Sequence, residues 1–274
     1  MTNSVGGAFL ERVRTALLAA LLGASGGLHA ATVQLEDLTW VELRERVAAG
    51  TSTVLVPIGG TEQNGPHMTL GKHNVRAMRL AIQVAERLGN AVVAPVVAYV
   101  PEGRIDPPTQ HMRYPGTLSI PEPVFEATLE AAARSLRRHG LREIVLLGDH
   151  GGYRASLDRV AAKLNREWGG SARVHALPEY YRALDGFAAM LQARGFSKDQ
   201  IGVHAGLADT SLMLALDPTQ VRMARAAAPR TGPAGADGVA GDPRRASAEL
   251  GQLGVAQIVE ATVAAIRVAA REAK

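Results

Sequence analysis

Residues 53–67, "TVLVPIGGTEQNGPH", hold the transition that decides the fold. The first six residues show no polar alternation, which is typical of a strand buried on both faces. Two glycines follow, and then a loop with the carboxylate Glu62, the amide Asn64 and the imidazole His67. Ligands bind beyond the carboxyl ends of parallel strands. The stretch therefore predicts a parallel sheet with a functional edge.

The same kind of apolar run recurs along the chain, and longer amphipathic runs separate the copies. This alternation predicts an α/β fold: a mostly parallel central sheet, covered by helices on both faces, in one domain over residues 31–274. Residues 226–245 are rich in Gly, Pro and Ala and predict one long loop. The expected strands are 52–59, 91–100, 142–148 and 172–178, the expected helices are 37–50, 74–89, 122–140, 155–169 and 246–273, and a further buried segment is 210–218.

The composition excludes several classes of protein. The chain has 274 residues with 47% hydrophobic and 20% charged residues, which is globular and enough for a large core. The net charge is only +4 and the basic residues form no run, so nucleic-acid binding is not expected. Cysteine is absent, which excludes disulfides, thiol nucleophiles and thiolate metal ligands.

The N-terminus has the order of regions typical of a secretory signal peptide. Arg12 and Arg14 precede an apolar run, Ala16 to Leu22, and small residues ending at Ala30 follow. The run is too short to anchor the chain in a bilayer. We expect residues 1–30 to be removed and the mature protein to be exported, most simply to the periplasm, with no stable membrane anchor. An amphipathic first helix of the domain is the alternative.

Three more loops carry side chains suited to chemistry. Asp149 and His150 follow the expected strand 142–148, His204 lies five residues before Asp209, and His111 lies close to Tyr114. A lone histidine is more often structural than functional, but four such loops on one scaffold indicate a shared site. Glu, His and Asp without Cys suit zinc, manganese or iron. Asp149 as a carboxylate nucleophile stays open as an alternative.

Five motifs in these loops resemble the signatures of the creatininase (creatinine amidohydrolase) family, in the family's order over residues 37–265. The resemblance implies an α/β/α three-layer fold, a metal-dependent hydrolase site, a small-molecule substrate and a homo-oligomer, commonly a hexamer. The motifs are "PIGGTEQNGPHMTLGKH" at 57–73, "HMRYPGT" at 111–117, "LGDHGGY" at 147–153, "HAGLADTS" at 204–211 and "GDPRR" at 241–245.

The departures from the family pattern concern its second metal ion. The histidine of the second site corresponds to Asn64, the bridging aspartate to His73, and the glutamate within the fourth motif to Asp209. Asparagine is a weak neutral ligand, and a neutral imidazole cannot bridge two cations as a carboxylate does. The resemblance therefore implies one divalent ion per chain in place of two.

By the same resemblance, Glu62, His73 and His150 are the expected metal ligands. Asp209 is expected close by, as a fourth ligand or base, and His204 as a general base or proton shuttle. Zinc is the expected ion, with manganese or iron as alternatives. His67 is expected to brace the loop. The predicted function is metal-dependent hydrolysis of a C–N bond, and the alternative is a binding or scaffold protein that has lost its metals.

Overall fold

The computed structural model describes residues 32–227 and 236–272. The predicted signal peptide lies outside these ranges, as does part of the predicted loop 226–245. Export and oligomer formation both stay predictions.

Four parallel strands form the sheet, in the order β2–β1–β3–β4. The two central strands pair over their full length, with Thr53 opposite Glu143 and Ile58 opposite Gly148. Their carboxyl ends therefore finish side by side, and the loops that follow them start from the same edge. The strands are β1 (Thr53–Ile58), β2 (Ala91–Val93), β3 (Glu143–Gly148) and β4 (Arg173–Ala176).

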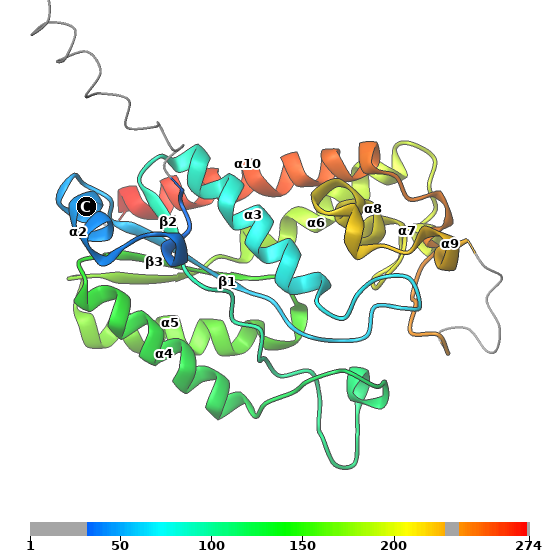
Figure 1. Cartoon of the computed structure of the whole chain (residues 1–274), viewed down its shortest axis with the longest axis horizontal. Helices are drawn as coiled ribbons and strands as arrows, with labels where there is room; N and C mark the ends of the chain where they lie inside the picture. The colour runs from blue at the N-terminus through cyan, green and yellow to red at the C-terminus, as the bar shows by residue number, and fades with distance from the viewer. Residues whose placement is uncertain (1–31, 228–235, 273–274) are drawn as a thin grey trace, which may run out of the picture. The chain divides into compact units, whose positions relative to one another are not determined.

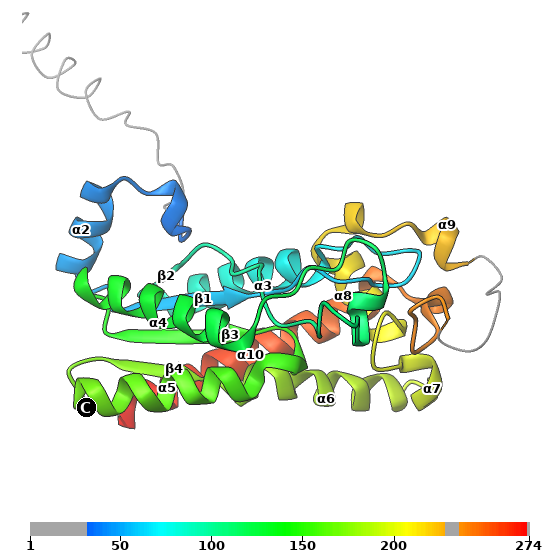
Figure 2. The same ribbon diagram turned by 90° about the horizontal axis from the view of Figure 1, so that it is seen from below.

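Helices cover both faces of this sheet (Figures 1 and 2). Alternate residues of each strand point to opposite faces. Leu55 and Val145 belong to the apolar core on the side of α3, α6 and α10, whereas Val54 and Ile144 belong to the core on the side of α4 and α5. The predicted three-layer α/β class is therefore confirmed. The helices of four or more residues are α2 (Trp40–Ala48), α3 (Lys72–Leu88), α4 (Glu122–Arg138), α5 (Arg154–Trp168), α6 (Pro178–Gln192), α7 (Lys198–Ile201), α8 (Leu207–Leu216), α9 (Met223–Ala226) and α10 (Ala248–Glu272).

Two expectations differ from the structure. The strand expected at 91–100 ends at Val93, because Pro95 has no N–H to continue the ladder, and pairing resumes only as a single bridge between Ile58 and Val97. The buried segment expected at 210–218 lies mostly in helix α8, whose apolar residues are spread around the helix and show no helical period. The sequence pattern does not predict α6.

The long C-terminal helix α10 contributes Val255, Ile258 and Ile266 to the core on the α3 side. Its length and apolar composition would also suit a membrane span. The same two properties are found in the core helix of a soluble protein, and the packing of α10 against α3, α6 and α8 fits that explanation.

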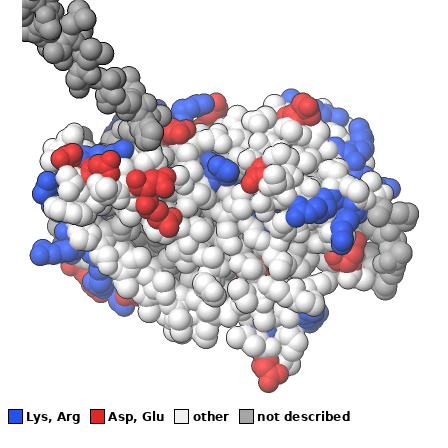
Figure 3. Space-filling view, viewed as in Figure 1, with Lys and Arg blue, Asp and Glu red and all other residues white. Residues whose placement is uncertain are grey.

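Charged side chains of both signs are mixed over the face drawn in Figure 3. Several of the exposed pairs link the neighbouring helices α4 and α5. Lys163 Nζ lies 2.7 Å from Glu130 Oε2, and Arg159 lies within hydrogen-bond distance of Glu122 and Glu126. Exposed pairs of this kind contribute about 0–1 kcal/mol each to stability.

Candidate metal centre

The loops beyond β1 and β3 meet at the carboxyl edge of the sheet, as predicted. Tyr153 holds them together: its hydroxyl oxygen lies 2.8 Å from the carbonyl oxygen of Ile58 and 2.7 Å from that of Gly59, and it accepts a hydrogen bond from the backbone N–H of His150 at 3.1 Å. This buried phenol fixes the start of the Glu62 loop against the start of the His150 loop.

Three side chains converge at this edge in the way that a metal site requires. One ligand-type atom each from Glu62, His111 and His150 lies within 4.8 Å of the other two. Glu62 Oε2 is 3.2 Å from His111 Nε2 and 3.6 Å from His150 Nε2. The carboxylate is fully buried, whereas the His111 and His150 side chains are 22% and 18% exposed. Glu62 therefore forms the floor and the two imidazoles form the accessible side.

An unpartnered oxygen shows that this set fits a cation. Among the described residues, Glu62 Oε2 is a buried side-chain oxygen that accepts no hydrogen bond. Buried polar atoms in folded proteins are nearly always paired, so this oxygen of an ionised carboxylate calls for a positive partner. A divalent ion is such a partner, and imidazole with carboxylate is a donor set that zinc and manganese accept.

His73 lies beside this set, between two carboxylates. Its Nε2 is 2.8 Å from Glu62 Oε1 and its Nδ1 is 2.6 Å from Asp149 Oδ2. Each contact is a hydrogen bond only if the ring nitrogen carries a proton. Arg76 Nη2 is also 3.2 Å from Nδ1, but an arginine only donates, so the shorter contact to Asp149 decides the proton's position. With the proton on Nδ1 alone, the lone pair on Nε2 faces Glu62 Oε1, whereas a doubly protonated ring has no lone pair for a metal ion.

Asp209 is also engaged by other groups. Its Oδ1 accepts from Arg76 Nη1 at 2.6 Å, and its Oδ2 accepts from Lys72 Nζ at 3.1 Å and from the backbone N–H of Ala205 at 2.9 Å. Although burial opposes ionisation, the charges of Lys72 and Arg76 outweigh it and hold the pKa of Asp209 well below its ordinary value. Both oxygens of the carboxylate are therefore already neutralised by side chains.

Glu102 is a site residue that the sequence motifs do not reveal. It is 1% exposed, and its Oε2 lies 3.7 Å from His150 Nδ1. Burial, and then the charge of nearby Glu62, raises the pKa of Glu102 to about 9, so the carboxyl is protonated at neutral pH in the metal-free protein. The sequence offers one signal for Glu102, which is its position. It follows the segment that runs alongside β1, and ligands gather beyond the carboxyl ends of strands.

The imidazoles of the centre are held in the neutral form. Burial, with a smaller contribution from the charge of His73, lowers the pKa of His150 to about 3. Burial and then the charge of Lys72 lower the pKa of His204 to about 4, and burial lowers the pKa of His111. Glu62 is ionised: burial opposes this, but the hydrogen bond and charge of His73 and the charge of Lys72 keep its pKa well below the ordinary value.

These shifts predict that the metal-free protein loses stability in mild acid. The unfolded chain protonates His150 and His204 near their ordinary pKa of about 6.5, whereas the folded chain resists protonation of these side chains until about pH 3 and 4, respectively. Protons therefore favour the unfolded state, and this part of the stability, complete above about pH 6.5, is lost as the pH falls towards 4. Denaturation midpoints of wild type and His204→Gln between pH 7 and 4.5 test this. The loss should be smaller in the variant, and equal losses would contradict it.

Asn64 and His67 brace the loop that carries Glu62. The Asn64 side-chain amide donates to the carbonyl oxygens of Glu62 at 2.9 Å and Thr69 at 3.1 Å. His67 Nε2 lies 2.9 Å from the hydroxyl of Thr210 on α8. Both side chains thus tie the loop to backbone or to a helix, and neither reaches the Glu62–His111–His150 set.

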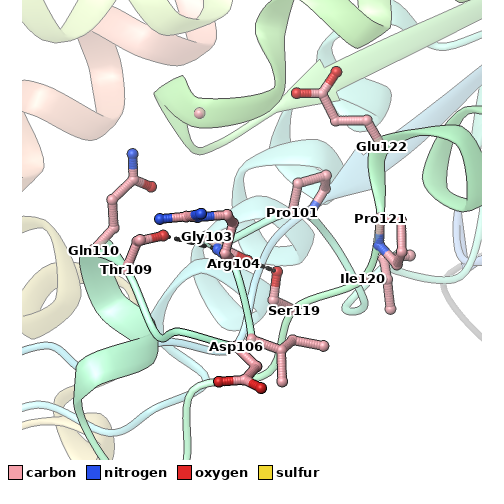
Figure 4. Close-up of a pocket in the computed structure, with 12 residues that line it drawn as sticks. Pro101, Gly103, Arg104, Asp106, Thr109, Gln110, Ser119, Ile120, Pro121 and Glu122 are labelled. Carbon is pink, nitrogen blue, oxygen red and sulfur yellow. Dashed lines mark hydrogen bonds between the residues drawn. The ribbon is translucent and has the colours of Figure 1, made fainter.

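A pocket of about 610 Å³ lies beside the centre (Figure 4). Its wall includes Gly152, two residues after His150, and Gln110, which precedes His111. In Figure 4 the side chains of Arg104, Thr109 and Gln110 lie at one end and Glu122 at the other. The pocket therefore has charged groups of both signs and shares its loops with the two imidazoles.

Comparison with known proteins decides the family. A model of the family described as creatinine amidohydrolase matches residues 36–266. The chain belongs to the creatininase family. Members of this family are hydrolases, and generally metal-dependent amidohydrolases.

Relatives within the creatininase family differ in what they act on. A creatinine amidohydrolase of Pseudomonas putida is 31% identical over 201 residues, which is 71% of this chain and 75% of that protein. A mycofactocin precursor peptide peptidase of Mycolicibacterium smegmatis is 32% identical over 173 residues, 61% of this chain and 59% of that protein. A 3-dehydro-scyllo-inosose hydrolase of Thermotoga maritima is 28% identical over 43% of this chain and 36% of that protein.

Solved creatininase structures superimpose over most of the chain. A mutant creatininase matches with a TM-score of 0.73 at 29% identity, covering 86% of this chain and 98% of that one. A mutant of the "Zn-Zn type" and a creatininase described as "Mn" match at 0.70 and 0.71, each at 29% identity and over 86% of this chain and 97% and 98% of theirs. Those creatininases thus hold divalent ions, and another mutant is complexed with creatine.

Proposed function

We propose that this protein is a metal-dependent hydrolase that cleaves a C–N bond of a small amide or cyclic amide. One observation carries the proposal: His111 Nε2 and His150 Nε2 lie 3.2 Å and 3.6 Å from the unpartnered Glu62 Oε2. Zinc bonds of about 2.0–2.1 Å place the donor atoms of a tetrahedral site about 3.3 Å apart. The spacing thus suits one ion bound by these three side chains.

The proposed ligands are Glu62, His111 and His150, with His111 in place of the expected His73. The reason is that His111 Nε2 and His150 Nε2 both face Glu62 Oε2, whereas His73 Nε2 faces the other oxygen, Oε1. A divalent ion in this place supplies a Lewis acid for a carbonyl oxygen and makes a water molecule more acidic. Zinc and manganese are the ions found in similar structures, and we propose zinc first.

His204 is the proposed proton carrier. Its Nε2 lies 3.0 Å from the carbonyl oxygen of Gln63 and 3.1 Å from the side-chain nitrogen of Gln63, and its Nδ1 lies 3.7 Å from Glu62 Oε1. In the tautomer with the proton on Nε2, the lone pair on Nδ1 faces the centre. His204 accepts a proton from the water that attacks the carbonyl carbon and delivers it to the leaving nitrogen as the C–N bond breaks. Asp209 is not given this role, because Lys72 and Arg76 already bind its oxygens.

The pocket of Figure 4 is the proposed place for the part of the substrate beyond the scissile bond. Arg104 gives it one cationic group and Asp106 and Glu122 give it two anionic groups, which suits a zwitterionic or peptide-like molecule. The named relatives act on creatinine, on a precursor peptide and on an inosose, so the substrate screen must cover cyclic amides, short peptides and non-amide carbonyl compounds.

Metal content and hydrolysis, measured on the same preparation, test the proposal. Protein purified without chelators and then supplied with Zn²⁺ or Mn²⁺ should hold about one ion per chain. It should release amine from at least one amide class, and chelation should abolish that release. Protein that takes up neither ion would overturn the proposal and favour the binding or scaffold alternative.

Glu102 should tune the metal site from behind His150. An imidazole that binds a metal through Nε2 carries its proton on Nδ1. In the metal-free protein His150 Nδ1 accepts from the backbone N–H of Gly152 at 3.2 Å, and Glu102 Oε2 lies 3.7 Å away as the acceptor for the proton that metal binding requires on Nδ1. Replacing Glu102 with Leu should weaken zinc binding by about 10–100-fold, because such outer-shell carboxylates orient the ligand. Metal-free Glu102→Leu should be no less stable than wild type, because burial and the charge of Glu62 already disfavour an ionised carboxyl group there.

The two readouts separate orientation from structure. Competition with a chelating dye measures zinc affinity, and urea denaturation measures stability. In Glu102→Leu the zinc affinity should fall, whereas the stability of the metal-free protein should stay the same or rise. Glu102→Gln, which keeps an acceptor oxygen, should recover part of the affinity. A Glu102→Leu protein with unchanged zinc affinity would remove the orienting role.

A further inference from the structure

The first two turns of α3 carry two cations inside the protein. Lys72 is 0% exposed and Arg76 is 2% exposed, and they lie one turn apart on the buried face of the helix. Lysine and arginine are almost never fully buried unless they are paired. Their partners therefore explain why the chain keeps them there.

Both cations bind the acidic groups around the proposed metal centre. Arg76 Nε is 2.8 Å from Asp149 Oδ2 and Arg76 Nη1 is 2.6 Å from Asp209 Oδ1, so one guanidinium joins two carboxylates. Lys72 Nζ is 3.1 Å from Asp209 Oδ2 and 3.9 Å from Glu62 Oε1. The ammonium thus lies between the carboxylate floor of the centre and the carboxylate of α8.

The acceptors around Lys72 are the kind that a second divalent ion would use. They are Glu62 Oε1 and Asp209 Oδ2, and His204 Nδ1 lies 3.7 Å from Glu62 Oε1. Some creatininases hold two zinc ions, as the name of the "Zn-Zn type" structure states. In the present chain the same kind of acceptor cluster already holds an ammonium group.

Charge balance points the same way. The carboxylates of Glu62, Asp149 and Asp209 bring three negative charges, and Lys72 and Arg76 bring two positive charges, which leaves −1 before His73 is counted. One divalent ion changes this sum to +1, and two would change it to +3. Uncompensated charge in a buried site costs several kcal/mol per ion. The cluster can thus take one divalent ion, but a second would lack counter-charge.

We infer that Lys72, supported by Arg76, is a built-in cation that occupies the place of a second metal ion and limits this centre to one. The inference rests on the proposed function only for the first ion. It assigns Lys72 a positioning role: its charge holds Asp209 and Glu62 Oε1 together without metal. The second position is thus a divalent-cation site with carboxylate and imidazole groups nearby, in which an ammonium group takes the place of the metal ion.

Lys72→Met tests the inference, because methionine keeps the length of the side chain and removes its charge. Zinc and manganese titrations by calorimetry, with native mass spectrometry of the same samples, should give about one ion per chain for wild type and about two for Lys72→Met. Lys163→Met is the matched control. It also removes an ammonium that binds a carboxylate, but on the exposed surface of α5, and it should stay at about one.

The possible results separate the two proposals. One ion in wild type and a second only in Lys72→Met supports the inference. One ion in both, or two ions already in wild type, overturns it, while the proposed function stands. No ion in wild type overturns the proposed function. In that case, an ion that binds only to Lys72→Met supports the inference, and no ion in either protein overturns it. If Lys72→Met folds only when metal is supplied, it is purified in excess Mn²⁺. Two ions per chain then support the inference, and one ion per chain overturns it.

Discussion

Replacing Glu62 with Gln is expected to abolish both tight metal binding and hydrolysis. The variant keeps the shape of the side chain but loses the charge that faces His111, His150 and Lys72. Outer-shell changes alone weaken metal binding by about 10–100-fold, so the loss of the only anionic ligand should exceed about 100-fold in affinity. Activity at limiting zinc should fall at least as far.

Glu143→Gln is a suitable control for this experiment. Glu143 also pairs with a histidine, with its Oε2 2.6 Å from His175 Nε2, but it lies at the opposite end of β3 from the centre. Metal content and turnover should be unchanged in that variant. Circular dichroism of both variants shows whether the sheet is intact. A folded Glu62→Gln protein that still holds zinc as tightly as wild type would contradict the proposed site.

Replacing Arg76 with Met should cause the largest loss of stability of any change considered. Asp149 is buried and the Asp209 side chain is only 16% exposed, and they would lose the group that lies 2.8 Å and 2.6 Å from them. Breaking a buried ion pair by removing one partner costs about 3–5 kcal/mol, because the remaining charge stays buried. Urea denaturation of the metal-free protein at pH 7 measures this directly.

The surface offers a matched comparison and the pH offers a second check. Arg159→Met breaks the contacts of an exposed arginine on α5 to two glutamates on α4, and should cost only about 0–1 kcal/mol of stability.

Although burial opposes it, the charge of Arg76 keeps the pKa of Asp149 below its ordinary value. The contribution of this ion pair to stability is therefore complete above about pH 4 and is lost on further acidification. The difference in the free energy of unfolding between wild type and Arg76→Met should therefore become smaller below that pH. A constant difference would mean that the loss comes from packing.

The sequence predicts the sheet well because its strands are short, apolar and separated by clear helical periods. It predicts α6 and α8 poorly. The apolar residues of α8 (Leu207–Leu216) are spread around the helix, so its sequence shows no helical period. The strand expected beyond Val93 fails for a local reason, the missing N–H of Pro95. Period and composition thus identify elements with one buried face, and lose those that are wholly buried or interrupted.

The candidate site is predictable in its location and less so in its pairings. The rule that ligands gather at strand ends selects Glu62, Asp149 and His150 from sequence. It does not say which histidine reaches Glu62 Oε2, because that depends on how the segment with His111 returns to the sheet edge. The charges of α3 do leave a trace: Lys72 and Arg76 continue the buried stripe of Leu80 and Val84, where apolar residues are expected.

Arg76 also has a consequence for the order in which the chain folds. Its two carboxylate partners are 73 and 133 residues away along the sequence, at the end of β3 and in α8. Contacts across such long loops form late, because the entropy of loop closure is lost before the contact repays it. A folding intermediate with a finished sheet and an undocked α8 leaves half of this guanidinium's partners missing. Docking of α8 and neutralisation of Arg76 are therefore one cooperative event, and a chain with an assembled centre has completed nearly all of its tertiary structure.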